Sequence, residues 1–479
     1  MAEIGVVGAA VMGSNLARNI ESKGYSVVIY DKMRQATETF LSLYAEGKRI
    51  EAAWTAKELA AKLERPRKIL VMIRAGAPVD ELLETLVPLL DKGDTVIDGG
   101  NSDFHDTQRR AARLRQAGVL YLGMGVSGGE QGALHGPSLM PGGDFEAWES
   151  CRDFLTDIAA KAPNGEPCCA YLGADGAGHF TKTVHNGIEY GDMELLCEAY
   201  QLMRCAMGMT AEEISDVFDA WGDGGMLDGY LLSISRDILR YRENGKQLVD
   251  CILDVAGQKG TGKWTVIESL ELGEPSTVVG EAMFARFLSA KKRERTAAGK
   301  LFERPCIQKP DGSFLGRLKD ALLAAKIILY AQGCGIIAGG AEKYGWELRV
   351  PTAARLWRGG CIIRSNMLEH IAAAYEKEPK LANMMLSPEF AKVLGDAVPG
   401  LREVVAEGAR RGIPIPAFSS ALAYFDGYCC DKLPANLLQA MRDCFGAHGY
   451  RREDDPNGEP CHTDWTGRGG KIGSGAYNA

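Results

Sequence analysis

Short runs of β-branched and apolar residues alternate with helix-like patterns in the first part of the chain, and this alternation constrains the fold more than any other feature. The runs are IGVVG, SVVIY, KILVMI, TVIDGG, LYLGMGV and CCAYLG. Strands separated by helical segments are typical of a mainly parallel sheet covered by helices. We therefore predict an α/β domain over residues 1–176.

Strand-like runs disappear after this domain, and helical spacing replaces them over residues 177–434. One example is QLVDCILDVA at 247–256, where apolar residues recur at helical intervals. We predict a large all-α domain here. Its most apolar stretch, 321–341, contains Lys326 and Gln332. We interpret this stretch as a buried core helix and not as a membrane span.

The last segment, residues 435–479, is rich in glycine and poor in aliphatic side chains. Such a composition cannot form a core by itself. Two interpretations stay open: a disordered tail, or a tail that becomes ordered by docking on another subunit.

Charge and cysteine usage narrow the class of protein. The net charge of −8 argues against a nucleic-acid or anionic-membrane binder. The 13 cysteines are odd in number and include no C-x-x-C pair, which indicates reduced thiols and a cytoplasmic location. We expect no signal peptide, because the strand-like run begins at once, and no metal site, because the seven histidines show no metal-binding spacing.

A glycine-rich loop follows the first strand and precedes a helix. It reads G-x-A-x-x-G, with Gly8, Ala10 and Gly13 at the three small positions. A loop of this kind brings a helix N-terminus against the pyrophosphate of a dinucleotide. The alternative is a tight turn that serves packing alone.

The end of the second strand bears on the choice of coenzyme. Asp31 occupies the position where a carboxylate normally holds the ribose hydroxyls of NAD. Lys32 and Arg34 follow it and could neutralise the 2′-phosphate of NADP. The local sequence is therefore ambiguous between the two coenzymes.

Residues 256–264, AGQKGTGKW, nearly match a P-loop. Trp264 stands where the Mg²⁺-binding Ser or Thr would be, so we reject a nucleotide triphosphatase. Lys259 and Thr261 still make this loop a candidate phosphate site. A glycine connector with a solvated lysine is the alternative.

Two other glycine-rich segments follow predicted strands. Ser127, Gly128 and Gly129 lie in GVSGGEQG, and Asn101 lies in DGGNSD. Ligands of open α/β sheets bind beyond the carboxyl ends of the strands. These residues are therefore candidate ligand contacts, although each segment alone could be only a turn.

The segment KTVHNGIEYG at 182–191 concentrates polar groups within one predicted helix. Lys182, His185, Asn186 and Glu189 fall within about one third of the helix circumference, and Tyr190 lies at the edge of that arc. The stripe is either a solvated face or an active site that carries a base and an acid.

Together these segments resemble the 6-phosphogluconate dehydrogenase family. The resemblance runs from the first strand to the closing SGAYNA and includes DGGNSD, WRGGCIIRS and QAMRDCFGAH. It implies a Rossmann-like domain over 1–176, a helical substrate and dimerisation domain over 177–434, and a tail over 435–479 that docks on the partner of a homodimer. It also implies oxidative decarboxylation of 6-phospho-D-gluconate in the pentose phosphate pathway, with NADP and without a metal.

The resemblance assigns roles residue by residue. Lys182 would be the general base and Glu189 the acid. Asn101, His185, Asn186 and the Ser127, Gly128 and Gly129 loop would hold the substrate's hydroxyls and carboxylate. Its phosphate would lie against Tyr190, Lys259, Thr261 and Arg286, with Arg442 and His448 from the partner. Coenzyme contacts would come from Gly8, Ala9, Ala10, Val11, Met12, Gly13, Asp31, Lys32, Met33, Arg34, Ile73, Arg74, Ala75 and Asn101.

These roles require shifted ionisation. A lysine normally titrates near pH ~10.4, so Lys182 needs a lowered pKa to act as a base. Glu189 needs a raised pKa to act as an acid near neutral pH.

The sequence departs from the family at the coenzyme. The family usually shows Asn-Arg-Thr after the second strand, where this chain has Asp31, Lys32 and Met33. We expect NADP because Lys32 and Arg34 remain, with NAD as the alternative. Two other functions stay open: a β-hydroxyacid dehydrogenase for a smaller, non-phosphorylated acid, and an inactive dinucleotide-binding sensor or scaffold.

Overall fold

The computed structural model describes residues 1–257, 260–303 and 305–467. In this part of the chain the N-terminal region holds one twisted sheet of strand order β3-β2-β1-β4-β5-β6-β7. All neighbouring strands are parallel except β6 and β7, which pair antiparallel. The strands are β1 Ile4–Val7, β2 Val27–Tyr30, β3 Ile50–Ala52, β4 Lys68–Val71, β5 Thr95–Asp98, β6 Leu120–Ser127 and β7 Ser138–Gly143.

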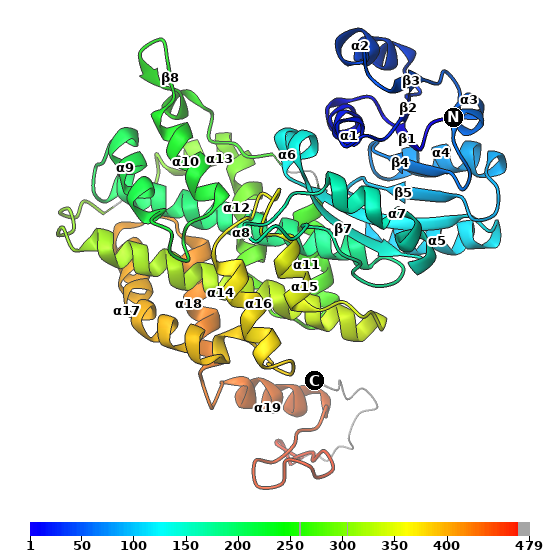
Figure 1. Cartoon of the computed structure of the whole chain (residues 1–479). Helices are drawn as coiled ribbons and strands as arrows, with labels where there is room; N and C mark the ends of the chain where they lie inside the picture. Colours follow the sequence, from blue (N-terminus) through cyan, green and yellow to red (C-terminus); the bar gives the residue numbers. More distant parts are fainter. Residues whose placement is uncertain (258–259, 304, 468–479) are drawn as a thin grey trace. The chain divides into compact units, whose positions relative to one another are not determined.

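Helices cover both faces of this sheet (Figure 1). One apolar core joins the sheet to α1, α2 and α7, and a second core joins its other face to α3, α4 and α5. The strand order reverses between β1 and β4, which places the glycine loop at a topological switch point. The helices are α1 Val11–Ser22, α2 Arg34–Tyr44, α3 Ala56–Lys62, α4 Ala77–Leu86, α5 Phe104–Gln116, α6 Gly129–His135 and α7 Phe145–Ile158, with a 3₁₀ turn at Val87–Leu89.

The predicted strand CCAYLG at 168–173 is wrong. This segment makes one isolated bridge, between Leu139 and Cys169. The edge position beside β6 is taken instead by β7, whose sequence SLMPGG carries proline and glycine and so lacks a strand signature. The short strand β3 was also not predicted.

The rest of the described chain is almost entirely helical, which confirms the predicted order of an α/β part followed by an all-α part. The helices are α8 Ala177–Cys205, α9 Ala211–Trp221, α10 Tyr230–Arg240, α11 Thr261–Leu272, α12 Thr277–Ala290, α13 Lys292–Ala298, α14 Phe314–Tyr344, α15 Val350–Leu356, α16 Met367–Lys377, α17 Pro388–Arg411, α18 Pro416–Tyr428 and α19 Ala435–Gly446. A 3₁₀ turn spans Met384–Leu386.

The predicted helix at 247–256 is wrong. A small hairpin of β8 Arg242–Glu243 and β9 Lys246–Gln247 leads into a 3₁₀ turn at Leu248–Cys251, and residues 252–256 form no helix or strand. Ile252 and Leu253 are 61% and 65% exposed. Apolar spacing alone therefore misled the prediction, because Ile252 and Leu253 are not covered by any element in the described part of the chain.

Helix α14 is, by length and composition, the one described helix that could cross a membrane, but 83% of its most apolar window is buried inside the protein. Its Lys326 Nζ lies 3.0 Å from Asp192 Oδ1 of α8, and both side chains are almost fully buried. Gly333 lets Ile188 of α8 approach, since a Cβ there would lie 2.5 Å from it. These contacts confirm the interpretation of 321–341 as a core helix.

The chain divides into two compact units, Met1–Leu422 and Ala423–Ala479. Within the second unit, the buried carboxylate of Asp443 accepts hydrogen bonds from the backbone of Gly449 and Thr463 and from the rings of His462 and Trp465. Burial opposes the charge on Asp443, but these donors hold its pKa well below its usual range. The described part of the tail is thus organised around one polar centre.

We expect Lys326→Met to lower the free energy of unfolding by about 3–5 kcal/mol, because Asp192 would be left as an unpaired buried charge. Thermal or urea unfolding measures this loss. The double variant Lys326→Met/Asp192→Leu removes both charges and should recover most of it. A double variant as unstable as the single one would contradict this account.

Candidate active site

The glycine loop has the backbone geometry that a dinucleotide site requires. Gly8 has φ +108°, and a Cβ there would lie 2.2 Å from the carbonyl oxygen of Met72. A Cβ at Gly13 would lie 2.0 Å from the carbonyl oxygen of Gly8. Helix α1 begins at Val11 without a side-chain cap. Its first-turn amides can therefore serve an anion, and the loop fits a pyrophosphate.

A cavity of about 640 Å³ lies beside this loop. Five predicted coenzyme residues line it: Met12, Ile73, Arg74, Ala75 and Asn101. The prediction missed Met72, Gly76, Gly99, Gly100, Asp103, Asp106, Val126 and Trp264, and it had placed Thr261 only against the substrate. Most of these residues follow β4 or β5, so the carboxyl-edge rule could have identified them.

Asp31 binds the protein's own backbone. Its Oδ2 accepts a hydrogen bond from the amide of Ala9 at 2.8 Å, and its Oδ1 accepts one from the amide of Met33 at 2.8 Å. The neighbouring cations are on the surface: Lys32 pairs with Glu81, and Arg34 pairs with Glu38 and stacks on Trp54. The residues from Asp31 to Arg34 are not among those that line the cavity.

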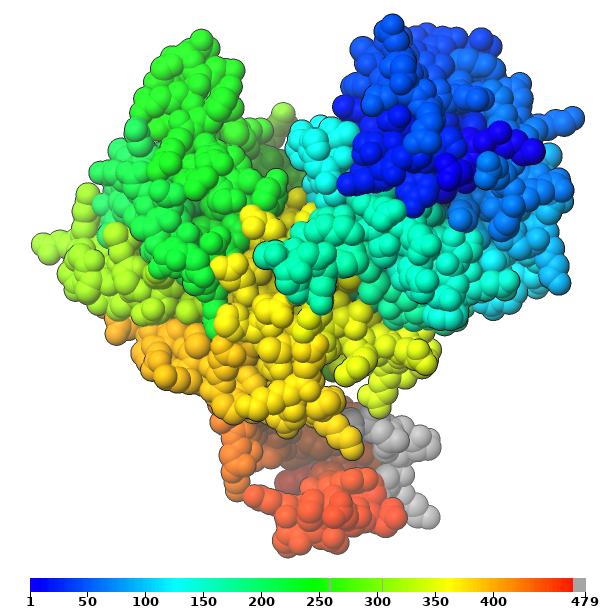
Figure 2. All heavy atoms as spheres, viewed as in Figure 1, coloured from blue at the N-terminus to red at the C-terminus, as the bar shows by residue number. Residues whose placement is uncertain are grey.

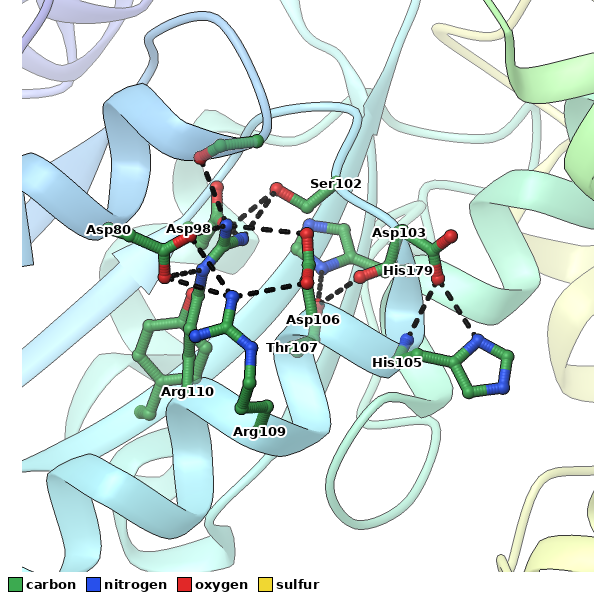
Figure 3. Close-up of polar contacts among 12 residues, drawn as sticks. Asp80, Asp98, Ser102, Asp103, His105, Asp106, Thr107, Arg109, Arg110 and His179 are labelled. Carbon is green, nitrogen blue, oxygen red and sulfur yellow. Dashed lines mark hydrogen bonds and ion pairs between the residues drawn. The ribbon is translucent and has the colours of Figure 1, made fainter.

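A buried polar network lies next to the cavity (Figure 3). Arg110 of α5 is 1% exposed and contacts Asp80, Asp98 and Ser102. In the same network Thr107 Oγ1 lies 2.7 Å from Nδ1 of His179 on α8. Nothing in the sequence patterns pointed to these residues.

Helix α8 lies so close to the sheet that Lys182 is buried. A Cβ on Gly125 of β6 would lie 2.4 Å from Cβ of Lys182, and a Cβ on Gly178 would lie 2.2 Å from the carbonyl oxygen of Gly123. Lys182 is 6% exposed. Burial lowers the pKa of its amine, against the opposing effect of Glu189.

His185 is fully buried, and protein atoms contact both of its ring nitrogens. Nε2 lies 3.1 Å from Ser127 Oγ and 2.8 Å from Cys361 Sγ. Nδ1 lies 3.0 Å from Oδ1 of Asn186. Burial holds the pKa of His185 well below its ordinary value, so the ring is neutral. The contact with Cys361 was not predicted.

The predicted loop after β6 begins within this cluster. Ser127 ends the strand, and Gly128 has φ +118°, where a Cβ would lie 2.6 Å from the carbonyl oxygen of Gly360. The amide of Ser138 donates to that same carbonyl at 2.8 Å. The segment around Gly360 therefore packs on the start of β7. In the space-filling view of Figure 2, the yellow part of the chain lies against the teal part. This packing brings Cys361 to His185.

Glu189 lies one helical turn beyond His185, and its Oε2 is 3.8 Å from His185 Nδ1. Burial raises the pKa of Glu189, although Lys182 and Arg286 oppose the rise. The structure thus lowers the pKa of the lysine and raises that of the carboxyl group on one face of α8. This pattern is characteristic of an acid and base pair.

A cationic position lies next to this pair. The guanidinium of Arg286, on α12, stacks 3.6 Å from the ring of Tyr190 and donates to the carbonyl oxygen of Gly257. Thr261 opens helix α11, and a Cβ on Gly262 would touch the Tyr190 ring. Lys259, the other predicted phosphate contact, lies outside the described residues.

The remaining predicted residues belong to the second unit. Arg442 of α19 donates to Oε1 of Gln439 at 3.0 Å, and His448 follows the helix with its ring against Phe445. In the described part of the chain, no group of three His, Cys, Asp or Glu side chains could hold a metal ion.

Comparisons with known proteins agree along the whole chain. Residues 3–173 match the family model of the NAD binding domain of 6-phosphogluconate dehydrogenase, and residues 178–465 match that of its C-terminal domain. The decarboxylating 6-phosphogluconate dehydrogenase 2 of Saccharomyces cerevisiae is 51% identical over 100% of this chain and 99% of its own length. The mouse decarboxylating enzyme is 47% identical over 100% of this chain and 99% of its own.

A solved structure gives the same result. The Plasmodium falciparum 6-phosphogluconate dehydrogenase, described in its apo form and in complex with NADP+ and with 6-phosphogluconate, superimposes with a TM-score of 0.93 at 40% identity. The match covers 97% of this chain and 100% of that one. With the site geometry above, these matches show that the chain belongs to the 6-phosphogluconate dehydrogenase family.

Proposed function

We propose that this protein oxidises and decarboxylates 6-phospho-D-gluconate to D-ribulose 5-phosphate and CO₂, with reduction of NADP, in the pentose phosphate pathway. The observation that carries the proposal is the pairing on helix α8 of Lys182, whose pKa is lowered by burial, with Glu189, whose pKa is raised. The names of the relatives and the ligands of the Plasmodium enzyme support the substrate and the coenzyme.

NADP would supply the hydride acceptor, held at the glycine loop and the 640 Å³ cavity. Neutral Lys182 takes the proton of the substrate's 3-hydroxyl as hydride leaves carbon 3. The product is a β-keto acid, whose carbonyl accepts the electrons released when CO₂ departs. Lys182 returns its proton to that carbonyl oxygen, which gives an enediol. Glu189 then protonates the terminal carbon while neutral Lys182 takes the proton of the hydroxyl on the adjacent carbon, which becomes the ketone of D-ribulose 5-phosphate.

We propose the following substrate contacts. Arg286 and Tyr190, together with Lys259 and Thr261, would hold the phosphate, with Arg442 and His448 supplied by the other subunit of a homodimer. Asn101, Asn186, His185 and the Ser127–Gly129 loop would orient the hydroxyls and the carboxylate. Because both nitrogens of His185 have protein contacts, we assign it chiefly to orienting Ser127 and Asn186. The domains would be 1–176, 177–434 and 435–479.

We further propose a cytoplasmic location. All 13 cysteines are free thiols, and several are exposed, including the adjacent Cys429 and Cys430. This usage fits a reducing compartment.

An assay of 6-phosphogluconate with each coenzyme tests the proposal. Reduced coenzyme is followed by absorbance, and CO₂ release is measured in parallel. We expect equal amounts of both products and a higher kcat/KM with NADP than with NAD. A preference for NAD of about tenfold, or ~1.4 kcal/mol, would overturn the coenzyme assignment. Absence of turnover with both coenzymes would overturn the function.

We expect kcat/KM to follow a bell-shaped dependence on pH. Activity falls as the pH drops below the pKa of Lys182, because the amine becomes charged, and it falls as the pH rises above the pKa of Glu189, because the acid loses its proton.

Lys182→Met should lower kcat by about 10²–10⁴-fold while coenzyme still binds. Glu194→Gln is the matched control for Glu189→Gln. Glu194 lies on the same helix, outside the proposed machinery, and burial raises its pKa to about 7. An unchanged profile in Glu189→Gln would contradict the assignment.

Mixing two inactive variants tests the shared site. Lys182→Met and Arg442→Ala homodimers are each expected to be nearly inactive. After the subunits are exchanged, about one quarter of the sites should combine an intact lysine with an intact partner arginine and regain activity. The two variants mixed without exchange are the control. No recovery after confirmed exchange would place Arg442 in its own subunit's site or in none.

A further inference from the structure

Two loops frame one side of the proposed coenzyme cavity. The first contains Arg74 and Gly76 after β4, and the second contains Gly100 and Asn101 after β5. Neither loop belongs to a helix or strand, so its position depends on the side chains around it. Gly76 is also the N-cap of α4 and supplies no side-chain cap.

Arg110 contacts the first loop from within the protein. Its Nη2 donates to the carbonyl oxygen of Gly76 at 3.0 Å, and its guanidinium binds both carboxylate oxygens of Asp80 at 3.0 Å. Asp80 lies in the first turn of α4, directly after this loop. The guanidinium of Arg110 holds the pKa of Asp80 well below its usual range. A bidentate pair of this kind fixes orientation as well as distance.

The same guanidinium reaches the second loop. Its Nη1 lies 3.4 Å from Ser102 Oγ and 3.5 Å from Asp98 Oδ2. Asp98, itself 1% exposed, accepts hydrogen bonds from the amide of Gly100 at 3.1 Å and from Ser102 Oγ at 2.7 Å. Arg110 therefore joins the two loops through one planar group, as Figure 3 shows.

Because Arg110 is buried, its contacts with the two loops are difficult to rearrange. A buried charge is tolerated only with its partners in place, so the network has one favourable arrangement. Arg110 is not among the residues that line the cavity. It can therefore act on a ligand there only through the loops.

We propose that Arg110 is a positioning residue for the coenzyme: it sets the distance between the two loops after β4 and β5 and so pre-organises the cavity. This inference rests on the proposed use of NADP. Loss of Arg110 weakens coenzyme binding although the residue does not touch the coenzyme. Substrate binding changes less than coenzyme binding, because Asn101 is the one proposed substrate contact on these two loops and the other proposed contacts lie on other elements.

The test compares Arg110→Met with Arg109→Met in the full-length enzyme. Arg109 is the adjacent residue on α5 and also pairs with Asp80 and Asp106, but its side chain is 53% exposed. NADPH affinity is measured by the fluorescence of the bound nicotinamide, and KM and kcat are measured separately. We expect Kd for NADPH and KM for NADP to rise about tenfold or more in Arg110→Met, and less than about twofold in Arg109→Met. The KM for 6-phosphogluconate should stay within about threefold.

Two other variants keep the result decisive if Arg110→Met does not fold. Asp80→Asn keeps the shape of the side chain but weakens the link to the first loop. Arg110→Lys keeps the positive charge but loses the planar guanidinium that binds both carboxylate oxygens of Asp80. Both should raise Kd for NADPH by an intermediate factor. Equal Kd values for the parent, Arg110→Lys and Asp80→Asn would overturn the inference, as would a loss of thermal stability without a change in Kd. A parent enzyme that neither binds NADPH nor turns over would refute the proposed function instead.

Discussion

The close approach of helix α8 to strand β6 is the constraint on which the rest of the site depends. Gly125 and Gly178 make it possible, because a Cβ at either position would overlap a neighbouring atom. The helix then presses Lys182 into the protein and leaves its amine with little solvent. The burial of Lys182 therefore depends on two glycine positions that have no side chain.

Burial is the common cause of the two opposed ionisation shifts. It penalises the charged form of any group, so it lowers the pKa of the Lys182 amine and raises that of the Glu189 carboxyl group. The proposed base and the proposed acid therefore obtain their opposite pKa shifts from the same physical cause. A chain of net charge −8 can still bind an anionic sugar phosphate if positive charge is placed locally, and Arg286 places one guanidinium beside the pair.

The contacts of Asp31 differ from the role in coenzyme binding that its position in the sequence suggested. A carboxylate at this position is usually associated with the ribose of NAD. Here its oxygens accept hydrogen bonds from the amides of Ala9 and Met33, which ties the glycine loop to the end of β2. The carboxylate thus has a structural use that is independent of the coenzyme, and its presence alone does not select NAD.

The sequence by itself determined the order of an α/β part and an all-helical part, the glycine loop, and the polar stripe from Lys182 to Tyr190. These features are local: strand and helix periodicity and fixed spacings within one helix express them directly. It did not determine strand β7, the loop at 248–256, or the burial of the Lys182 stripe. The tertiary structure decided those, because they depend on which distant segments pack together. The same holds for Cys361 beside His185 and for Arg110 between two loops, since residues far apart in sequence meet there and no pattern of spacing records the meeting.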